Sequence, residues 1–349
     1  MDAINPNEKV QLAEQLNTNS QAKVMSLIPQ FSEAKIHVCK ECKPHSIENI
    51  HALVFNMERG HNWREIIDFL KYSPDIQPFD LILANELDDG CTRTGEVDVT
   101  REIAEALNMH YVYALEFVEL MQTTASKGYH GNAILSRYPI RWAEVFHLPE
   151  ENNWFFEKQK RIGSRNAIFA ELDVGGRPLG IASIHLENKT SETGRRRQMQ
   201  AICDRAKELF SEETPILLGG DLNTNTFDGR DIDAIQWLAD HPDLLQKRVE
   251  KPENYESLLI ASEDSGFEFR ESACKGITRR KPLPDGKSLE LLLDWFLSRG
   301  LEVIDSRIIS TLTKDCQFAP SGSALAELQT EELSDHNAVW AKYSYPDTK

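Results

Sequence analysis

The sequence lacks several features that would point to a membrane or to secretion. No uncharged apolar run reaches the roughly 18 residues that a membrane-spanning helix needs, so no membrane span is expected. The first residues, MDAINPNEKVQLAEQLN, contain neither a basic region nor an apolar core, so the pattern of a secretory signal is missing. These absences predict a soluble, cytoplasmic protein.

Basic residues are also in short supply. The chain has 39 Lys and Arg against 56 Asp and Glu, a formal net charge of −17. Such an acidic chain repels polyanions at long range, which disfavours non-specific binding of nucleic acid through a basic surface. A small phosphorylated substrate is compatible with this charge, and so are acidic groups gathered around a metal ion.

Cysteine is sparse, and the six cysteines lack the paired spacing of a strong zinc site. Only Cys39 and Cys42 lie close together, flanked by His37 and His45 in HVCKECKPH. Two interpretations are open, a zinc or redox site and reduced thiols in a surface segment. The second is favoured because both histidines share one short segment, which is an awkward geometry for four ligands.

The pattern changes once along the 349 residues, near residue 50. Residues 1–49 are polar, with apolar residues at helical spacing in places, and are expected to form a partly helical N-terminal extension. From 50 to 345, short apolar runs alternate with helical segments, and no linker divides them. Strands are expected at 50–57, 79–87, 111–117, 131–136, 140–148, 166–174, 178–186, 215–219, 289–300, 301–309 and 334–343, and helices at 62–72, 97–109, 192–210 and 231–240. Residues 50–345 therefore read as one catalytic domain of the α/β (α+β) class, with mixed sheets covered by helices.

Polar side chains gather at the ends of these apolar strands. They are Asn56, Glu86, His185, Asp221 with Asn223, Asp294, and Asp335 with His336. A carboxylate is costly in apolar surroundings unless it is paired or bound to a metal. One such residue is usually a satisfied structural group, but their recurrence at strand after strand predicts a convergent cluster. Oxygen donors without cysteine suit Mg²⁺ or Mn²⁺, which points to metal-assisted attack of water on a phosphate ester.

The order of these motifs resembles the endonuclease/exonuclease/phosphatase superfamily, which includes the pancreatic-type deoxyribonucleases. The matching segments are FNMERG, NEL, GNAILSRYPI, SIHLE, GGDLNTN, LDWFLS and SDHNAV, in order from about residue 50 to 345. Each segment alone is weak, whereas GDLN, DW and SDH in sequence are specific. The resemblance implies a four-layer sandwich, in which two mixed β-sheets pack face to face with helices outside.

The resemblance also implies a role for each motif residue. Glu86 would be the main metal ligand, with Asn56 and Asp335 near the ion. Asp221 would orient or deprotonate the attacking water, and Asn223 would hold a phosphate oxygen. His336 would contact the phosphate, and Asp294 would orient the imidazole of His336. His185 would donate to a phosphate oxygen or act as acid to the leaving group. A protonated histidine paired with a carboxylate suits a phosphate that gains negative charge.

Five further residues are candidates for substrate binding or specificity. Arg165 precedes a strand that enters the same face, and is either a phosphate clamp or a surface arginine. Asn132 either hydrogen-bonds near the metal site or caps its strand. Loops after the first two motif strands form the pocket rim in the superfamily, which makes Arg59, His61 and Arg93 specificity candidates. Arg93 is preferred because it follows the metal-binding glutamate by seven residues.

Two loops leave alternatives open. The aromatic residues in ENNWFFEKQKR (151–161) would either stack on a base or lipid surface or, as is favoured, pack into the domain edge. The basic stretch ITRRKPLPDGK (277–287) would either recognise a phosphorylated leaving group or be solvated.

The function predicted from the sequence is hydrolysis of a phosphodiester or phosphomonoester in a small molecule or at a nucleic-acid end. The alternatives are a nuclease acting on DNA or RNA and a catalytically silent binding protein on the same fold. The silent protein is disfavoured because Glu86, Asp221 and His336 are all present. A further interpretation is that residues 1–49 recruit a partner through CKEC.

Overall fold

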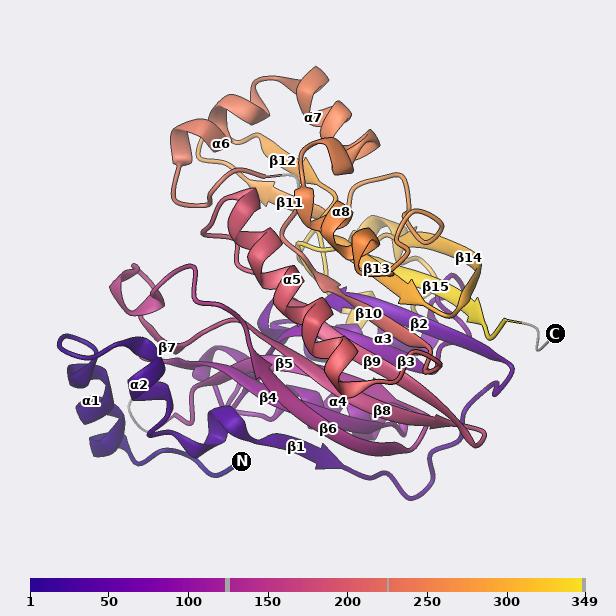
Figure 1. Cartoon of the computed structure of the whole chain (residues 1–349), viewed down its shortest axis with the longest axis horizontal. Coiled ribbons are helices and arrows are strands. Elements are labelled where there is room, and N and C mark those ends of the chain that lie inside the picture. Colours follow the sequence, from indigo (N-terminus) through magenta and orange to yellow (C-terminus); the bar gives the residue numbers. More distant parts are fainter. Residues whose placement is uncertain (123–125, 225, 347–349) are drawn as a thin grey trace.

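Two β-sheets form the centre of the computed structural model, which describes residues 1–122, 126–224 and 226–346 (Figure 1). The first sheet has eight strands in the order β1-β4-β5-β3-β2-β15-β14, with β7 also paired to β4. These strands are β1 (Ala34–His37), β2 (Asn49–Asn56), β3 (Leu81–Asp89), β4 (His110–Glu119), β5 (Tyr129–Ser136), β7 (Arg161–Gly163), β14 (Glu302–Ile309) and β15 (Ala338–Ser344). The second sheet has five strands in the order β13-β10-β9-β8-β6. They are β6 (Ile140–His147), β8 (Asn166–Val174), β9 (Arg177–His185), β10 (Ile216–Asp221) and β13 (Asp294–Arg299).

The two sheets pack face to face, and strand β2 shows how the sequence produces this arrangement. Successive strand side chains point to opposite faces of a sheet. Ala52 and Val54 accordingly belong to the core between the sheets, whereas Leu53 and Phe55 belong to the core under the helices. Both faces of the strand are buried, which explains why its sequence is a continuous apolar run and does not alternate.

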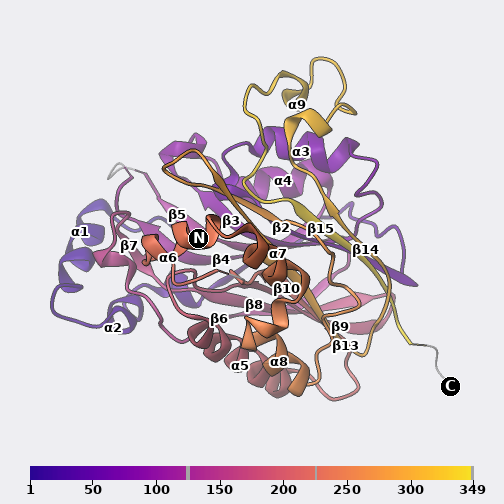
Figure 2. The same ribbon diagram turned by 90° about the horizontal axis from the view of Figure 1, so that it is seen from above.

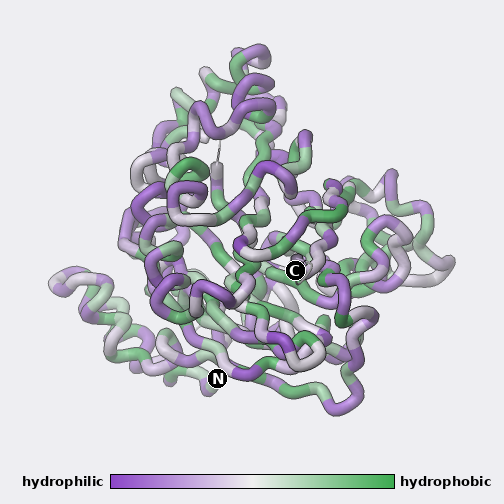
Figure 3. The backbone as a smooth tube through the Cα atoms, turned by 45° about the vertical axis from the view of Figure 1, so that its right-hand side comes forward, coloured by the Kyte–Doolittle hydropathy of each residue, from purple (hydrophilic) through white to green (hydrophobic). Residues whose placement is uncertain are grey.

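Helices cover the two outer faces and complete four layers (Figure 2). On the first sheet lie α3 (Trp63–Tyr72) and α4 (Val99–Leu107), and on the second lie α5 (Glu192–Leu209) and α8 (Ser257–Asp264). In α5, Met199, Ile202 and Ala206 recur at helical spacing and pack against the second sheet. Figure 3 shows the resulting alternation of hydrophobic and hydrophilic residues along the outer helices. The predicted four-layer sandwich of two mixed sheets is confirmed.

The N-terminal residues join the sandwich. Helices α1 (Pro6–Gln15) and α2 (Gln21–Met25) contribute Leu12 and Val24 to an apolar cluster with Leu115 of β4. Strand β1 pairs antiparallel with β4, so part of the segment predicted as an extension is an edge strand of the first sheet. Cys39 and Cys42 are free thiols beside this edge.

A smaller unit stands at one end of the sandwich. It contains α6 (Ile232–Ala239), α7 (Pro242–Glu250) and the hairpin of β11 (Arg279–Pro282) and β12 (Ser288–Leu291), which share a separate apolar cluster. The predicted single strand over 289–300 is wrong, because β12 pairs in this hairpin and β13 pairs with β10 in the second sheet. A last short helix, α9 (Ala324–Glu327), packs near α3. Within the described ranges, no helix has the length and apolarity to cross a membrane.

Candidate active site

The sheet register brings the predicted polar residues together at one end of the sandwich. Asp221, the last residue of β10, lies opposite His185 of β9 on one side and Asp294 of β13 on the other. Asn56 ends β2 of the first sheet, and its Nδ2 donates to Asp221 Oδ2 at 3.0 Å. Strand ends from both sheets therefore meet at Asp221.

Two glycines explain how the sheets approach so closely at this point. A side chain at Gly219 would come within 2.8 Å of Val54 and 3.0 Å of Leu83, both on the first sheet. Gly220 has φ +147°, and a Cβ there would lie 1.9 Å from the carbonyl oxygen of Ile184. The two glycines of LLGGD therefore let the end of β10 pack closely against the first sheet, and the strand ends with the carboxylate of Asp221.

A cavity of about 170 Å³ opens at this meeting point. Its lining includes eight residues named individually from the sequence: Arg59, Glu86, Arg165, His185, Asp221, Asn223, Asp335 and His336. Six other residues complete the lining: Glu58, Trp154, Gln159, Arg161, Asn188 and Arg279. Asn56 and Asp294 lie behind the pocket wall, where each contacts a lining residue.

Asp221 is fixed by three hydrogen bonds besides its ladder pairs. Its backbone N–H donates to Asn85 Oδ1 at 2.8 Å, Asn56 donates to Oδ2, and the N–H of Asn223 donates to Oδ1 at 2.9 Å. Asn223 has φ +49°, and its Nδ2 donates to the carbonyl oxygen of Leu186 at 2.9 Å. A buried carboxylate held by so many donors is a rigid acceptor aimed into the pocket.

His336 and Asp294 form a buried pair beside Asp221. The Nδ1 of His336 lies 2.8 Å from Asp294 Oδ2, and its Nε2 lies 3.7 Å from Asp221 Oδ2. Burial alone would lower the pKa of His336, but the charges of Asp294 and Asp221 raise that pKa to about 9. The imidazole is therefore protonated at neutral pH, with Nε2 available as a donor.

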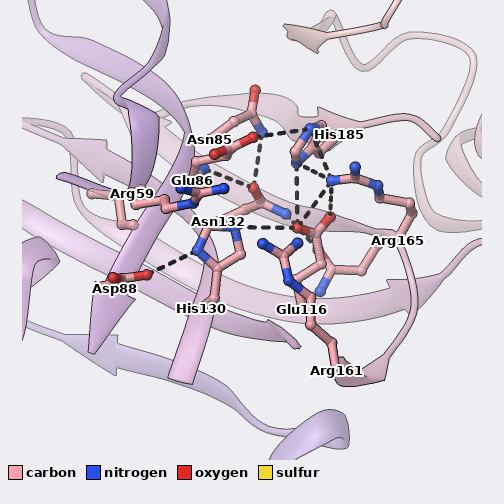
Figure 4. Close-up of polar contacts among 12 residues, drawn as sticks. Arg59, Asn85, Glu86, Asp88, Glu116, His130, Asn132, Arg161, Arg165 and His185 are labelled. Atoms are coloured by element: carbon pink, nitrogen blue, oxygen red, sulfur yellow. Dashed lines mark hydrogen bonds and ion pairs between the residues drawn. The ribbon is translucent and has the colours of Figure 1, made fainter. Parts of the chain in front are cut away.

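His185 and Arg165 share a buried carboxylate, Glu116, that the sequence analysis did not identify (Figure 4). His185 Nδ1 and Arg165 Nη1 each lie 3.3 Å from Glu116 Oε2. Burial would raise the pKa of Glu116, but the charges of His185 and Arg165 lower it to about 2. The signal for Glu116 was its place inside the apolar run YALEFV, where a carboxylate needs a partner.

Glu86 occupies an irregular position in β3. The pairing of β3 with β5 shifts register between Ala84 and Leu87, and Glu86 has φ +56°. Such a bulge with a left-handed residue re-aims a side chain and is common next to active sites. Asn132 supports the bulge, because its Oδ1 accepts from Asn85 Nδ2 at 3.1 Å and from the N–H of Glu86 at 3.3 Å.

Three carboxylates share the pocket near the bulge: Glu86, Asp335 and Glu58, the last of which was not predicted. Burial and the charges of Asp335 and Glu86 raise the pKa of Glu58 to about 7. A cation among them would remove that repulsion. Across the residues that the structure places, no group of three or more His, Cys, Asp or Glu side chains is already arranged around a metal position. The donors fit a hard divalent cation in chemical type, without a closed coordination shell.

Two predicted substrate contacts require correction. Arg93 does not line the pocket, because its guanidinium bonds Asp88 at 2.6 and 2.8 Å and Glu119 at 2.9 Å. Asn132 is fully buried and accepts from the N–H of Glu86, which is the first of its two predicted alternatives, so it positions the backbone of Glu86 and does not reach a substrate. Of the rim candidates, Arg59 is the one that enters the pocket.

Both loops with open alternatives reach the site. Trp154 is buried at the pocket wall and donates through Nε1 to Glu187 Oε2 at 2.8 Å, whereas Phe156 is exposed. Arg279 of β11 enters the pocket from the opposite side and bonds Asp335 Oδ2 at 2.9 Å. The basic stretch at 277–287 is therefore not simply solvated.

No protein-family model and no curated protein matches this chain. Solved structures do match it. An endonuclease/exonuclease/phosphatase family protein from Leptotrichia buccalis C-1013-b is 14% identical, with a TM-score of 0.54 over 85% of this chain and 100% of that one. A protein of the same family from Bacteroides thetaiotaomicron is 13% identical, with a TM-score of 0.54 over 86% of this chain and 98% of that one. The chain has the endonuclease/exonuclease/phosphatase fold.

The catalytic domain of human Nocturnin, determined with a bound sulfate anion, has this fold too. It is 13% identical, with a TM-score of 0.50 over 91% of this chain and 98% of that one. In the present endonuclease/exonuclease/phosphatase fold, the pocket lies where β2, β3, β9 and β10 end.

Proposed function

We propose that the chain is a divalent-metal-dependent phosphoesterase that hydrolyses a phosphate ester by attack of water. The observation that carries this proposal is the alignment of His185, Asp221 and Asp294 on three neighbouring strands, with His336 beside them. A rigid carboxylate next to a protonated imidazole is suited to activate water against a group that gains negative charge. The sulfate in Nocturnin is a tetrahedral anion of the same shape as phosphate, which supports an anion pocket in this fold.

Glu86, Glu58 and Asp335 would hold the cation. Their carboxylate oxygens are the donors that Mg²⁺ and Mn²⁺ prefer. When bound, the cation would polarise the phosphate and lower the pKa of bound water. Asn56 is already engaged, since its Nδ2 donates to Asp221 and its Oδ1 accepts from the N–H of Glu58 at 3.0 Å. This geometry favours Asn56 as a residue that positions two pocket carboxylates.

The other pocket side chains would activate the water and bind the phosphate. Asp221 accepts a proton from the attacking water, because Asn56 of the first sheet and the N–H of Asn223 hold its carboxylate in one orientation. His336 donates through Nε2 to a phosphate oxygen, and the charge of Asp294 keeps the imidazole of His336 protonated. His185 sits 3.7 Å from Asp221 and 4.0 Å from Glu86, where it contacts the phosphate from the other side. Arg165, held by Glu116, adds positive charge on that side.

The pocket favours a small phosphate ester over a long nucleic acid. Its volume of about 170 Å³ accommodates a phosphoryl group and little of a duplex. The formal charge of −17 also opposes binding of a polyanion outside the pocket. A nucleic-acid end is compatible with both observations, whereas a non-specific nuclease is not.

The test is hydrolysis of p-nitrophenyl phosphate and bis-(p-nitrophenyl) phosphate with Mg²⁺, Mn²⁺ or EDTA. Turnover should require the cation, and Asp221→Asn should lower kcat by about 10²–10⁴-fold, the range for loss of a positioned acid or base. Asp233→Asn, an exposed site on α6, is the matched control and should behave like the wild type. Activity that survives EDTA, or that survives Asp221→Asn, would rule out this mechanism, and no turnover of either ester would count against it.

A further inference from the structure

Four arginines line the pocket of this acidic protein, and they differ in how they are neutralised. Arg165 lies 3.3 Å from the carboxylate of Glu116, and Arg279 lies 2.9 Å from that of Asp335. Both guanidinium groups therefore have a carboxylate partner, although the buried Nε of Arg165 makes no hydrogen bond among the described residues. The other two are Arg59 and Arg161, and neither belongs to the set of residues that the proposed reaction uses.

Arg161 is buried, with 4% of its surface exposed, yet its hydrogen bonds are incomplete. Its Nε lies 3.1 Å from Glu119 Oε1 but makes no hydrogen bond within the described part of the chain. The same carboxylate binds Arg93 at 2.9 Å and accepts from Gln159 Nε2 at 3.2 and 3.3 Å. Glu119 is thus divided among three partners, and Arg161 faces the pocket with free N–H donors.

Arg59 is in a similar position on the neighbouring wall. Its one hydrogen bond among the described residues is from Nη2 to Gln159 Oε1, at 3.4 Å, and its buried Nε has no partner there. Arg59 also has φ +65°, a conformation that costs free energy for a residue with a side chain. Gln159 links the two arginines, because it contacts Arg59 through Oε1 and the carboxylate beside Arg161 through Nε2.

Both arginines lie near Glu86, the proposed cation ligand. In Figure 4, Arg59 and Arg161 extend toward Glu86 and Glu116 from different elements. The charges of Glu119 and Glu86 act on Arg161, and those of Asp335, Asp221 and Glu86 act on Arg279. Glu86 therefore stands between two cationic groups of the same pocket.

Buried N–H donors without acceptors are costly, so the free donors of Arg59 and Arg161 indicate a ligand with several acceptor oxygens. Guanidinium groups match the geometry of phosphate in particular. The cavity of about 170 Å³ is several times the share of about 30 Å³ that one water takes in the liquid, so it has room for two neighbouring phosphoryl groups. We infer that Arg59, Gln159 and Arg161 form a second anion subsite. Building on the proposed phosphoesterase function, the substrate class is a small molecule with a second phosphoryl group close to the one that water attacks.

The experiment compares the binding of inorganic pyrophosphate and inorganic phosphate to the full chain by calorimetry, with Mg²⁺ in constant excess. Pyrophosphate presents two adjacent phosphoryl groups, and phosphate presents one. Wild-type protein should bind pyrophosphate at least about tenfold more tightly, since each charge-assisted hydrogen bond contributes about that factor. Arg161→Gln and Arg59→Gln should each weaken pyrophosphate binding about tenfold and leave phosphate binding within about twofold.

Arg196→Gln, at an exposed position on α5, removes the same charge far from these contacts and should change neither affinity. Arg59 is only partly buried, so its variant tests the subsite even where Arg161→Gln folds poorly. Equal losses for both anions would overturn the inference, because the arginines would then hold the attacked phosphate. No loss for either anion would overturn it as well. Calorimetry needs no turnover, so an inactive protein that shows the expected affinities would refute the proposed reaction and leave the subsite standing.

Discussion

Asp294→Asn should reduce the pH dependence that His336 gives to the fold. In the folded protein the pKa of His336 is raised to about 9, above its ordinary value of 6.5. A raised pKa means that the charged imidazole stabilises the fold fully below pH 6.5 and that this contribution is lost as pH rises through 9. The rise corresponds to about 3 kcal/mol of unfolding free energy. The amide of asparagine keeps the shape of the side chain but removes its negative charge.

The assay is urea unfolding of the wild type and of Asp294→Asn in EDTA, at pH values from 6 to 10. The wild type should lose about 3 kcal/mol over this range, and the variant should lose less, because only the charges of Asp221 and Asp335 still favour its protonated imidazole. Groups elsewhere titrate equally in both proteins and cancel in the difference. Parallel curves for the two proteins would refute the assignment of the raised pKa to this pair. Where turnover is measured, the alkaline limb of the variant's pH profile should lie at lower pH than that of the wild type.

Three further outcomes are expected. Glu116→Gln should lower the unfolding free energy by about 3–5 kcal/mol in urea titrations, because it leaves a buried arginine without its carboxylate. Arg93→Ala should lower the unfolding free energy by a similar amount, since Asp88 and Glu119 lose a buried partner. The same substitution should leave KM within about twofold. A large rise in KM would restore Arg93 as a substrate contact. Mg²⁺ should raise the thermal midpoint by binding the folded state, and Glu86→Gln should abolish that rise in differential scanning fluorimetry.

The strand ends were the part of the site that the sequence could predict. Apolar runs fix the strands, and a polar residue at the end of each must lie at the sheet edge, so Asp221, His185 and Asp294 come together by register alone. The prediction for Arg93 failed because the number of residues between Glu86 and Arg93 does not show where the Arg93 side chain points. The bulge at Glu86 turns that side chain into the pocket, while Arg93 folds back onto a buried carboxylate.

Glu58 and Arg161 were missed for related reasons. Glu58 lies in η2 (Glu58–Gly60), a 3₁₀ turn in which Glu58 and Arg59 both have positive φ, and no periodicity marks such a turn. Arg59 was named from the sequence, but only as one of three candidates on the pocket rim. Arg161 belongs to β7, a strand of three residues, which is too short to show alternation. Arg279 enters the pocket through a hairpin whose place is fixed by the apolar cluster of the end unit. These positions depend on tertiary contacts that local sequence does not encode.

The hydrogen bonds to Asp221 tie the two sheets together through the site itself. Its backbone N–H belongs to β10 of the second sheet, but the acceptor, Asn85, belongs to β3 of the first. That amide cannot exchange its hydrogen with solvent unless the sheets part. Its exchange should therefore be among the slowest in the chain and follow global unfolding. A local fluctuation that frees the pocket rim would leave it untouched, so the Asp221 carboxylate and the sandwich core lose their order in the same event.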